Sequence, residues 1–514
     1  MKRAVLLVFS AVFCCLCLVG CAEPVPTDIE FSSGRVELDV QDLSIVLQPG
    51  ETQLLDSLEQ LQTADFSGSE RYDEIFEWAQ KNPDVDVLYT IALPDGTVVD
   101  NHIQHLDLSE TEPKLFTQTA QLMKYMPELE SVDLSADSRE VSVDDFANIS
   151  SVKPELTYSA VFKLRGQKFS SSAKALDMTG ISAEEAEDFS IILPSMKELE
   201  SVELGDQESS PELEFAHISA MQKACPQADF AYSFQLFDQS FTTADTSMNL
   251  AYTRMYDNGA AVMEAISCMP RLEYLDMDSC HVPDEDMAKI RDAYPNVKVV
   301  WRVWFGDNYC VRTDAEKILA SMPSVGGELT PENTTSLKYC TEIKYIDVGH
   351  NNYLTDISFV NYMPNLEAAI FAMDFITDVS PLANCPKLEF LEIQTSKVSD
   401  ISPLADLTNL RHLNICYLYE LDDISPIMDL ELERLWIGDL SPVPAEQIEE
   451  YRKRHPNCRI STENRDPHDG GWRYDQNEKG VWGMHPRYEL LVKQFGYDAA
   501  AYSFPWKDPL YRYH

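Results

Sequence analysis

The sequence predicts an α/β solenoid, a horseshoe with a parallel sheet on its concave side and a mixed helical and extended convex side. Two observations lead to this prediction. Residues 343–440 repeat with steps of 23, 22, 22 and 22 residues, counted between the first apolar residues Ile343, Leu366, Leu388, Leu410 and Leu432. Residues 61–342 carry a longer period, in which similar strings begin at Pro83, Pro154, Pro226 and Pro295, with steps of 71, 72 and 69.

The repeats of 343–440 have a common layout: LxxLxL, a turn, and then D-[IV]-S-[PF]. The alternating apolar residues predict a short strand whose Leu positions point into the core. Asp and Ser suit a tight return because their side chains bond local backbone groups, and Pro fixes φ there. This pattern resembles the internalin-like class of bacterial leucine-rich repeats. The resemblance implies a leucine-rich-repeat horseshoe.

The long modules contain more than one coil each. A helix-like stretch precedes each of the four prolines, and an alternating strand, a turn and a return strand follow it. Pro83, Leu106, Leu129 and Pro154 divide one module into steps of 23, 23 and 25 residues, which is leucine-rich-repeat length. We therefore expect continuous coils over 61–342, with 311–342 the least regular part, and a closing coil at 441–461.

The N-terminal residues 1–20 have the features of a lipoprotein signal peptide. Lys2 and Arg3 precede an apolar run from Val5 to Val19, and the run ends in L-V-G-C at Cys21. This string resembles the bacterial lipobox, which implies lipid on Cys21 and an extracytoplasmic protein anchored to the cell membrane. The alternative is an ordinary secretory signal. We expect 21–35 to be the lipidated Cys with its tether, and 36–60 to be an N-terminal cap.

The charge excludes two classes of partner. The 514 residues include 40 Lys+Arg and 86 Asp+Glu, for a net charge of -46. Nucleic acid is not an expected partner, because polyanions need basic surfaces. Adsorption to anionic lipid is disfavoured for the same reason. No later stretch approaches about 18 consecutive apolar residues, so we expect membrane contact through the lipid anchor only.

Eight cysteines lie outside the signal region, at Cys225, Cys268, Cys280, Cys310, Cys340, Cys385, Cys416 and Cys458. None forms a CxxC pair, and their spacing matches no zinc ribbon. Cys340 and Cys385 each stand three residues before the first apolar anchor of a strand, which indicates a stacked core position. Buried thiols are favoured over disulfides, although an extracytoplasmic compartment permits disulfides.

The sequence carries no catalytic signature. The phosphate-binding, dinucleotide-binding, zinc-protease and serine-hydrolase motifs are all absent. His102 and His105 are expected to be solvent histidines, and the loop from Asp466 to Asp469 is not expected to bind metal. We therefore expect a protein that is not an enzyme, with no cofactor and no metal.

Strand residues that alternate with the buried leucines should face the concave side. They form a column of large, partly aromatic side chains beside acidic ones, a composition that suits partner binding. The opposing interpretation is cross-strand pairing that only stabilises the sheet. The candidate binding residues are Tyr274, Asp276, Tyr345, Asp347, Phe390, Glu392, His412, Arg434 and Trp436.

The tail, residues 462–514, is rich in aromatics, including Trp472, Trp482 and Trp506. We expect a hydrophobic C-terminal cap with its Trp side chains buried against the last coil; the alternative is a separate glycan- or wall-binding element. The tail strings G-G-W-R (470–473) and H-P-R-Y (485–488) complete a layout that resembles bacterial leucine-rich-repeat surface lipoproteins of the anaerobic Gram-positive type. That resemblance implies fold and placement, and no activity.

The expected function is non-catalytic. The sequence predicts a lipid-anchored extracytoplasmic leucine-rich-repeat protein that binds a protein or glycan at the cell surface through its concave face. One alternative is a structural or assembly scaffold of the cell envelope, whose shape alone spaces its partners. A less favoured alternative is a hydrolase with its site in the C-terminal tail.

Overall fold

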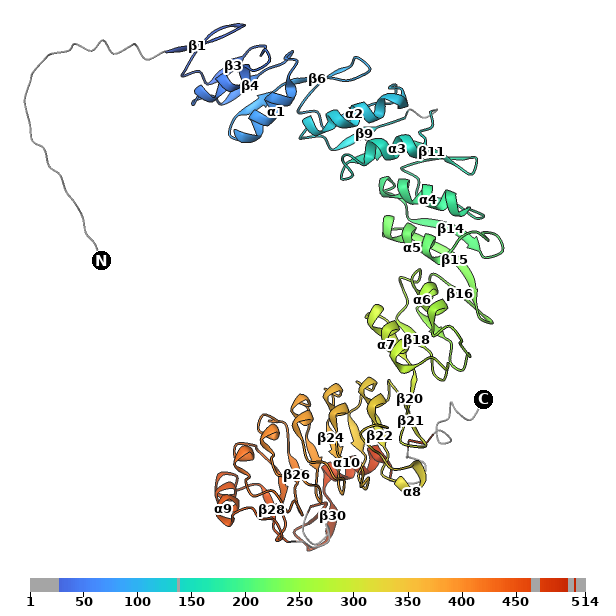
Figure 1. The fold of residues 1–514 in the computed structure, drawn as a ribbon, viewed down its shortest axis with the longest axis vertical. Helices are drawn as coiled ribbons and strands as arrows, with labels where there is room; N and C mark the ends of the chain where they lie inside the picture. Colours follow the sequence, from blue (N-terminus) through green and yellow to red (C-terminus); the bar gives the residue numbers. More distant parts are fainter. Residues whose placement is uncertain (1–26, 136–138, 464–471, 498–502, 505–514) are drawn as a thin grey trace, which may run out of the picture. The chain divides into compact units, whose positions relative to one another are not determined.

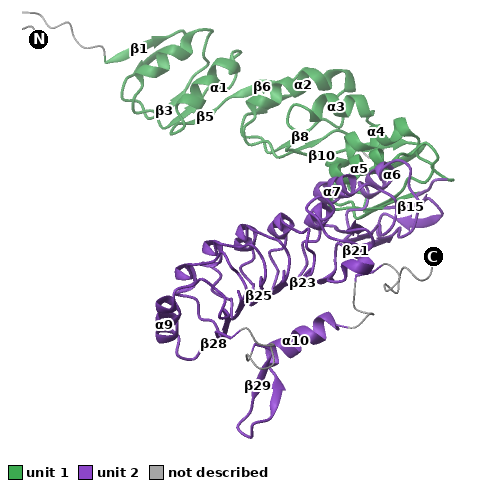
Figure 2. Ribbon diagram, turned by 60° about the horizontal axis from the view of Figure 1, so that its bottom comes forward, with its two compact units in different colours: residues 1–204, 208–230 green, residues 205–207, 231–514 purple. Residues whose placement is uncertain are grey.

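The computed structural model describes residues 27–135, 139–463, 472–497 and 503–504 (Figure 1). The chain divides into two compact units, residues 1–204 with 208–230 and residues 205–207 with 231–514 (Figure 2). The expected signal peptide and Cys21 lie outside the described residues. Within the described ranges, no helix has the length and apolar character needed to cross a membrane.

The first unit is built from parallel strands, most of them three residues long with a buried middle residue. In the strand around Leu106, for example, that side chain is only 2% exposed while both neighbours face solvent. The parallel strands of this unit are β3 (Asp42–Ser44), β4 (Thr63–Asp65), β5 (Asp86–Leu88), β8 (His105–Asp107), β9 (Ser131–Asp133), β10 (Thr157–Ser159), β13 (Ala175–Asp177) and β14 (Ser201–Asp206).

Helices form the return segments of the first unit. The helix that begins at Ala183 has a capping box, because the Ser182 hydroxyl accepts from the Glu185 N–H and the Glu185 carboxylate accepts from the Ser182 N–H. Its side chains Ala186, Phe189 and Ile192 are buried. The helices are α1 (Tyr72–Lys81), α2 (Phe116–Leu122), α3 (Val143–Ser150), α4 (Ala183–Ile192) and α5 (Phe215–Ala224), with 3-10 turns η1 (Glu51–Ser57), η2 (Pro113–Leu115), η3 (Met123–Tyr125) and η4 (Leu193–Ser195).

Antiparallel hairpins explain the long period. A hairpin follows the third parallel strand of a module, so the module holds three coils plus one projecting ribbon. In one of them Arg165 and Gly166 have φ of 53° and 77°, the positive pair that a tight two-residue turn requires. These hairpins are β6 (Thr90–Ala92) with β7 (Val98–Asp100), β11 (Val161–Leu164) with β12 (Gln167–Ser170), β15 (Asp229–Leu236) with β16 (Gln239–Thr242), and β20 (Arg302–Phe305) with β21 (Tyr309–Arg312).

The second unit contains a three-stranded and a seven-stranded parallel sheet. The first consists of β17 (Ser247–Asn249), β18 (Tyr274–Asp276) and β19 (Lys298–Val300); the second of β22 (Lys317–Leu319), β23 (Tyr345–Asp347), β24 (Ala368–Ile370), β25 (Phe390–Glu392), β26 (His412–Asn414), β27 (Arg434–Trp436) and β28 (Arg459–Ser461). Its helices are α6 (Ala260–Ile266), α7 (Asp284–Ala293), α8 (Pro323–Gly326), α9 (Ala445–Arg454) and α10 (Pro486–Phe495).

The steps predicted for 343–440 are confirmed, since strands begin at 345, 368, 390, 412 and 434. The D-[IV]-S-[PF] segments form 3-10 turns rather than extended segments. Each turn begins where an Asp carboxylate accepts a backbone N–H two residues later, as Asp378 does from Ser380 at 2.7 Å. The 3-10 turns of this unit are η5 (Thr335–Tyr339), η6 (Ser358–Tyr362), η7 (Ser380–Asn384), η8 (Ser402–Leu404) and η9 (Ser425–Ile427).

The ends of the solenoid differ from the predicted boundaries. Strands β1 (Asp28–Phe31) and β2 (Gly34–Glu37) form a hairpin in the range expected to be a tether. Strand β3 lies inside the expected N-terminal cap, so parallel pairing begins earlier than predicted. The closing coil at 441–461 forms as predicted, with α9 leading into β28, the last strand of the seven-stranded sheet.

The eight cysteines outside the signal region are buried, and the described residues contain no disulfide. Burial raises the pKa of Cys385 and Cys416 to about 12, which keeps these thiols protonated at neutral pH. The preference for buried thiols over disulfides agrees with the structure.

Candidate binding site

The predicted concave residues of the seven-stranded sheet form two columns. Strands β23 to β27 pair in register, and the residues between the columns are fully buried on the opposite face. One column is Tyr345, Ala368, Phe390, His412 and Arg434; the other is Asp347, Ile370, Glu392, Asn414 and Trp436. Tyr274 and Asp276 belong to the separate sheet of β17 to β19, so they lie outside these columns.

The tail of the same chain covers both columns. Phe390, His412 and Trp436 are 1%, 0% and 3% exposed. Phe390 and Trp436 share a buried cluster with tail residues from Trp472 to Phe495, and His412 contacts the Trp472 ring. Helix α10 lies alongside β22 and β23 (Figures 1 and 2). The structure therefore places a segment of this chain where an external partner was expected.

Trp472 is the centre of the apolar contact. Its ring centroid lies 5.5 Å from that of Phe390, 5.6 Å from that of His412 and 6.2 Å from that of Trp436. The expected burial of a tail Trp is therefore found, but across three strands of the concave face rather than at the last coil alone. Trp482 is 44% exposed, and Trp506 lies outside the described residues.

A buried carboxylate lies under the tail. Glu392 is fully buried and accepts a hydrogen bond from Trp472 Nε1 at 2.7 Å and one from Arg473 at 3.2 Å. The Arg473 guanidinium also lies 4.8 Å from the ring centroid of Tyr488. A buried charge is tolerated only when it is paired and hydrogen-bonded. The tail thus supplies the donors that this buried carboxyl group needs.

Further ion pairs join the tail to the sheet. Asp475 pairs with Arg434 and, at 2.7 Å, with Arg459. Burial on its own would raise the pKa of Asp475, but the hydrogen bond from Arg434 and the positive charges of Arg434 and Arg459 together outweigh it, and the pKa lies below its usual range. Arg487 pairs with Glu389 and, at 3.2 Å, with Glu433.

Asp347 lacks such a strong cationic partner. Burial raises its pKa to about 7, and the negative charge of Glu392 acts in the same direction. The Gly349 N–H at 3.1 Å and the Tyr497 hydroxyl donate to the carboxylate and partly oppose this shift. Asp347 therefore changes its charge near neutral pH, under the tail.

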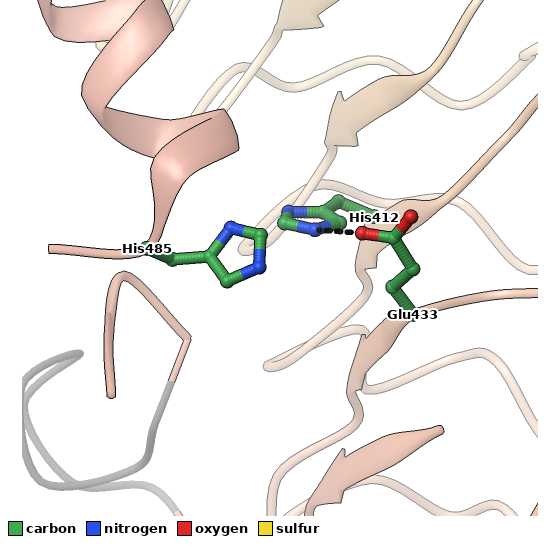
Figure 3. A group of neighbouring side chains, drawn as sticks. All are labelled: His412, Glu433 and His485. Atoms are coloured by element: carbon green, nitrogen blue, oxygen red, sulfur yellow. Dashed lines mark ion pairs between the residues drawn. The ribbon is translucent and has the colours of Figure 1, made fainter. Parts of the chain in front are cut away.

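His412, Glu433 and His485 meet at the junction of sheet and tail (Figure 3). Burial, together with the neighbouring His485, Arg487 and Arg434, lowers the pKa of His412 to about 2. Burial also lowers the pKa of His485, with Arg434 acting in the same direction. Both rings are therefore neutral near pH 7, the form in which imidazole binds metals.

The histidines named in the sequence do not form such a group. His102 binds Glu128 at 2.6 Å, whereas His105 binds the Ser131 hydroxyl at 2.6 Å, so their rings have different partners. The loop from Asp466 to Asp469 lies outside the described residues. Sequence reasoning missed His412 with His485 because the two are far apart in the chain, although His485 belongs to the H-P-R-Y string.

A cavity of about 630 Å³ lies beyond the carboxyl ends of β17, β18 and β19. Its lining comes from the turns that follow these strands, from the start of α7 and from β20. Parallel sheets commonly place ligands beyond the carboxyl ends of their strands. The lining residues are Tyr252, Met277, Ser279, Cys280, His281, Val282, Pro283, Asp284, Trp301, Arg302 and Trp304. No periodic pattern in the sequence indicated this cavity.

Buried ion pairs fix the floor of the cavity. Arg302 donates two hydrogen bonds to Asp278, at 2.9 and 2.6 Å, and both side chains are almost fully buried. Burial alone would raise the pKa of Asp278, but these bonds hold it below its usual range. Arg312 binds Asp276 at 3.1 Å and the Tyr274 hydroxyl at 3.0 Å. The two predicted binding residues of β18 thus belong to this supporting network.

The cavity mouth offers an aromatic face beside polar groups. Trp304 is 49% exposed, whereas Trp301 is buried and donates its Nε1–H to Asp284 at 3.0 Å. Ser279 and His281 have φ of 58° and 61°. The same left-handed conformation recurs at His350, Met373, Thr395 and Tyr417, in the turns that follow other strands, so it is a feature of the repeat turn.

Three solved structures illustrate what the chain is similar to. An internalin from Listeria monocytogenes shows 19% identity over 72% of this chain and 84% of its own, with a TM-score of 0.26. A second internalin from that organism shows 21% identity over 44% and 76%, with a TM-score of 0.21. A leucine-rich-repeat protein of Leptospira interrogans shows 14% identity over 82% and 93%, with a TM-score of 0.24. No protein-family model and no curated protein matches the chain.

Proposed function

We propose that this chain is a non-catalytic binding protein, held outside the bacterial cell membrane by lipid on Cys21, that binds a protein or glycan partner. The observation that carries the proposal is the cavity of about 630 Å³ beside β17, β18 and β19. Pockets for small ligands commonly measure about 300 to 1,000 Å³, so the cavity can admit one ring-bearing group of a larger partner.

The lining determines what that group is. The half-exposed Trp304 ring presents a flat apolar surface, on which a sugar ring or an aromatic side chain can stack. His281 and Ser279 border the same cavity and can exchange hydrogen bonds with a hydroxyl-rich partner. The net charge of -46 disfavours a polyanionic partner.

The absence of catalysis is part of the proposal. Acid–base chemistry needs a titratable group within reach of the substrate. The cavity's Asp284 accepts from Trp301, and its Arg302 is held by Asp278. These two groups support the wall of the cavity, which leaves His281 as a lining residue that can exchange hydrogen bonds with a partner. The non-catalytic proposal therefore rests on the sequence, which carries none of the catalytic motifs named above. The placement outside the cell depends on the signal-like N-terminus ending in Cys21.

The test uses the soluble mature chain from residue 22. Its binding is measured against wall glycans of the producing organism, host and dietary glycans, and surface proteins. Trp304→Ala should abolish binding, because the stacking surface is lost. Tyr256→Ala is the matched control, since Tyr256 is 85% exposed and does not line the cavity. Equal binding by wild type and Trp304→Ala would contradict the proposed site.

The columns under the tail are the second candidate site. The tail contacts this face through aromatic packing and ion pairs, and we propose that an external peptide can make the same kinds of contact. If an external partner uses this face, it must displace the tail. Trp472→Ala should then strengthen binding, whereas a partner of the cavity should bind wild type and Trp472→Ala equally.

A further inference from the structure

Three potential metal ligands come together from separate segments of the second unit. His412 lies on β26, Glu433 directly precedes β27, and His485 is the N-cap residue of α10. One ligand atom from each lies within 4.8 Å of the other two. Figure 3 shows the two sheet residues side by side and His485 approaching from the tail.

His412 is the unusual member of this group. Its side chain is fully buried, and neither ring nitrogen has a hydrogen-bond partner among the described residues. A buried polar group without a partner is costly, so such groups in folded proteins nearly always have one. The Nε2 atom lies 3.4 Å from a Glu433 carboxylate oxygen. The two atoms are thus close to each other without forming a hydrogen bond, and a metal ion between them would take the Nε2 lone pair.

We propose that His412, Glu433 and His485 bind one divalent ion of the zinc class, and that this ion fastens residues 472–497 to the concave sheet. Two imidazoles and one carboxylate, with water in the fourth position, are a ligand set that zinc accepts. Calcium and magnesium prefer oxygen ligands alone, so they do not fit this set. The site was not expected from the sequence, because its ligands come from three segments.

The distances suit one ion after a small movement. Tetrahedral zinc at about 2.0–2.1 Å from each ligand separates the ligand atoms by about 3.3 Å. The His412 and Glu433 atoms already meet this at 3.4 Å, so the remaining movement falls to His485. His485 Nδ1 accepts the Arg487 N–H at 3.2 Å. Ligation through Nε2 puts the ring proton on Nδ1, so this single capping bond is given up.

The cations beside the group are themselves paired with carboxylates. Arg434 is paired with Asp475, and Arg487 is paired with Glu389 and Glu433. These carboxylates offset the repulsion that the two arginines would exert on a bound metal ion.

The experiment uses the soluble mature chain from residue 22 with zinc as the probe. Zinc binding is measured by calorimetry in excess calcium, which occupies carboxylate sites. His485→Asn removes one ligand but keeps an efficient helix N-cap. Glu433→Gln is an independent second variant of nearly equal shape. His350→Asn is the matched control, an exposed histidine outside the group. Hydrogen exchange of the α10 amides, with and without zinc, reports the attachment of the tail.

We expect one zinc ion per wild-type chain, and we expect each ligand variant to weaken its binding by at least about tenfold while His350→Asn does not. Zinc should slow exchange in α10 of the wild type and not of His485→Asn. No binding, or equal binding by the ligand variants, would overturn the site. Binding that is lost in the variants but leaves α10 exchange unchanged would overturn the fastening role. None of these outcomes depends on the partner of the cavity.

Discussion

Trp472→Ala should release the tail while the coils stay folded. Trp472 is 1% exposed, with its ring against three strands and its Nε1 bonded to Glu392 at 2.7 Å. The coils keep their own core of fully buried residues such as Leu391, Leu413 and Leu435, which the tail does not supply. The substitution therefore acts on a local opening of residues 472–497 rather than on unfolding of the solenoid.

The size of the effect follows from the buried surface. A Trp side chain buries about 200 Å², which at about 25 cal/mol per Å² corresponds to about 5 kcal/mol as an upper value. Large-to-small changes at buried Trp cost about 3–5 kcal/mol. Water that reaches Glu392 in the variant offsets the lost hydrogen bond. We therefore expect Trp472→Ala to lower the free energy of opening of the tail by about 4 kcal/mol. Since about 1.4 kcal/mol is tenfold, the open state should become about 10³-fold more populated.

Hydrogen exchange measures this opening directly. Amides of α10 should lose protection by up to about 10³-fold in Trp472→Ala, while amides of β25 to β27 should keep theirs. Trp482→Ala is the control, because Trp482 belongs to the same tail and is 44% exposed. Unchanged protection of α10 in Trp472→Ala would refute the conclusion that the concave contact holds the tail.

Two further predictions concern charge and packing. Burial raises the pKa of Asp347 to about 7 in the folded chain, whereas the unfolded chain loses this proton near pH 4. The contribution of Asp347 to the free energy of unfolding therefore falls as pH rises from about 4 to about 7. The free energy of unfolding of Asp347→Asn, measured by urea titration, should lack this fall with pH. Parallel pH profiles for the wild type and Asp347→Asn would contradict the prediction. Gly326→Ala should cost about 1–3 kcal/mol, because a Cβ there would lie 2.0 Å from the Tyr309 ring. In the same urea titration Gly483→Ala should lower the free energy of unfolding much less, because a Cβ at position 483 would have no atom within 4 Å.

The coils could be predicted because their physics is local. A strand that buries alternate residues requires apolar side chains at alternate positions of a short segment, so the pattern is visible in the sequence. The Asp and Pro of each return turn lie a few residues further along the chain. The steps between Leu366, Leu388, Leu410 and Leu432 therefore matched the observed strands. The hairpins could be placed for the same reason, since a turn such as Arg165-Gly166 is encoded by two adjacent residues.

The tail contact could not be predicted, because its partners are distant in the chain. Trp472 and Glu392 are separated by 80 residues, and no periodic pattern connects them. The G-G-W-R and H-P-R-Y strings marked the right residues without saying what they touch.

The sequence could also not separate surface acids from structural ones. Asp107 and Asp177 accept backbone N–H groups of Ser109 and Thr179, so they close turns at the ends of their strands.

The return of the tail to β22 sets an order of events during synthesis. Ser503 exchanges backbone hydrogen bonds with Leu319 and Cys310, at the opposite end of the sheet from β28. Chains are made from the N-terminus, so the coils can stack before the residues that cover them exist. Until then, Phe390 and Trp436 form an exposed apolar face, the kind of surface that promotes aggregation. Residues 472–497 are thus made after the coils that they cover, and a chain truncated before Trp472 would carry this face uncovered.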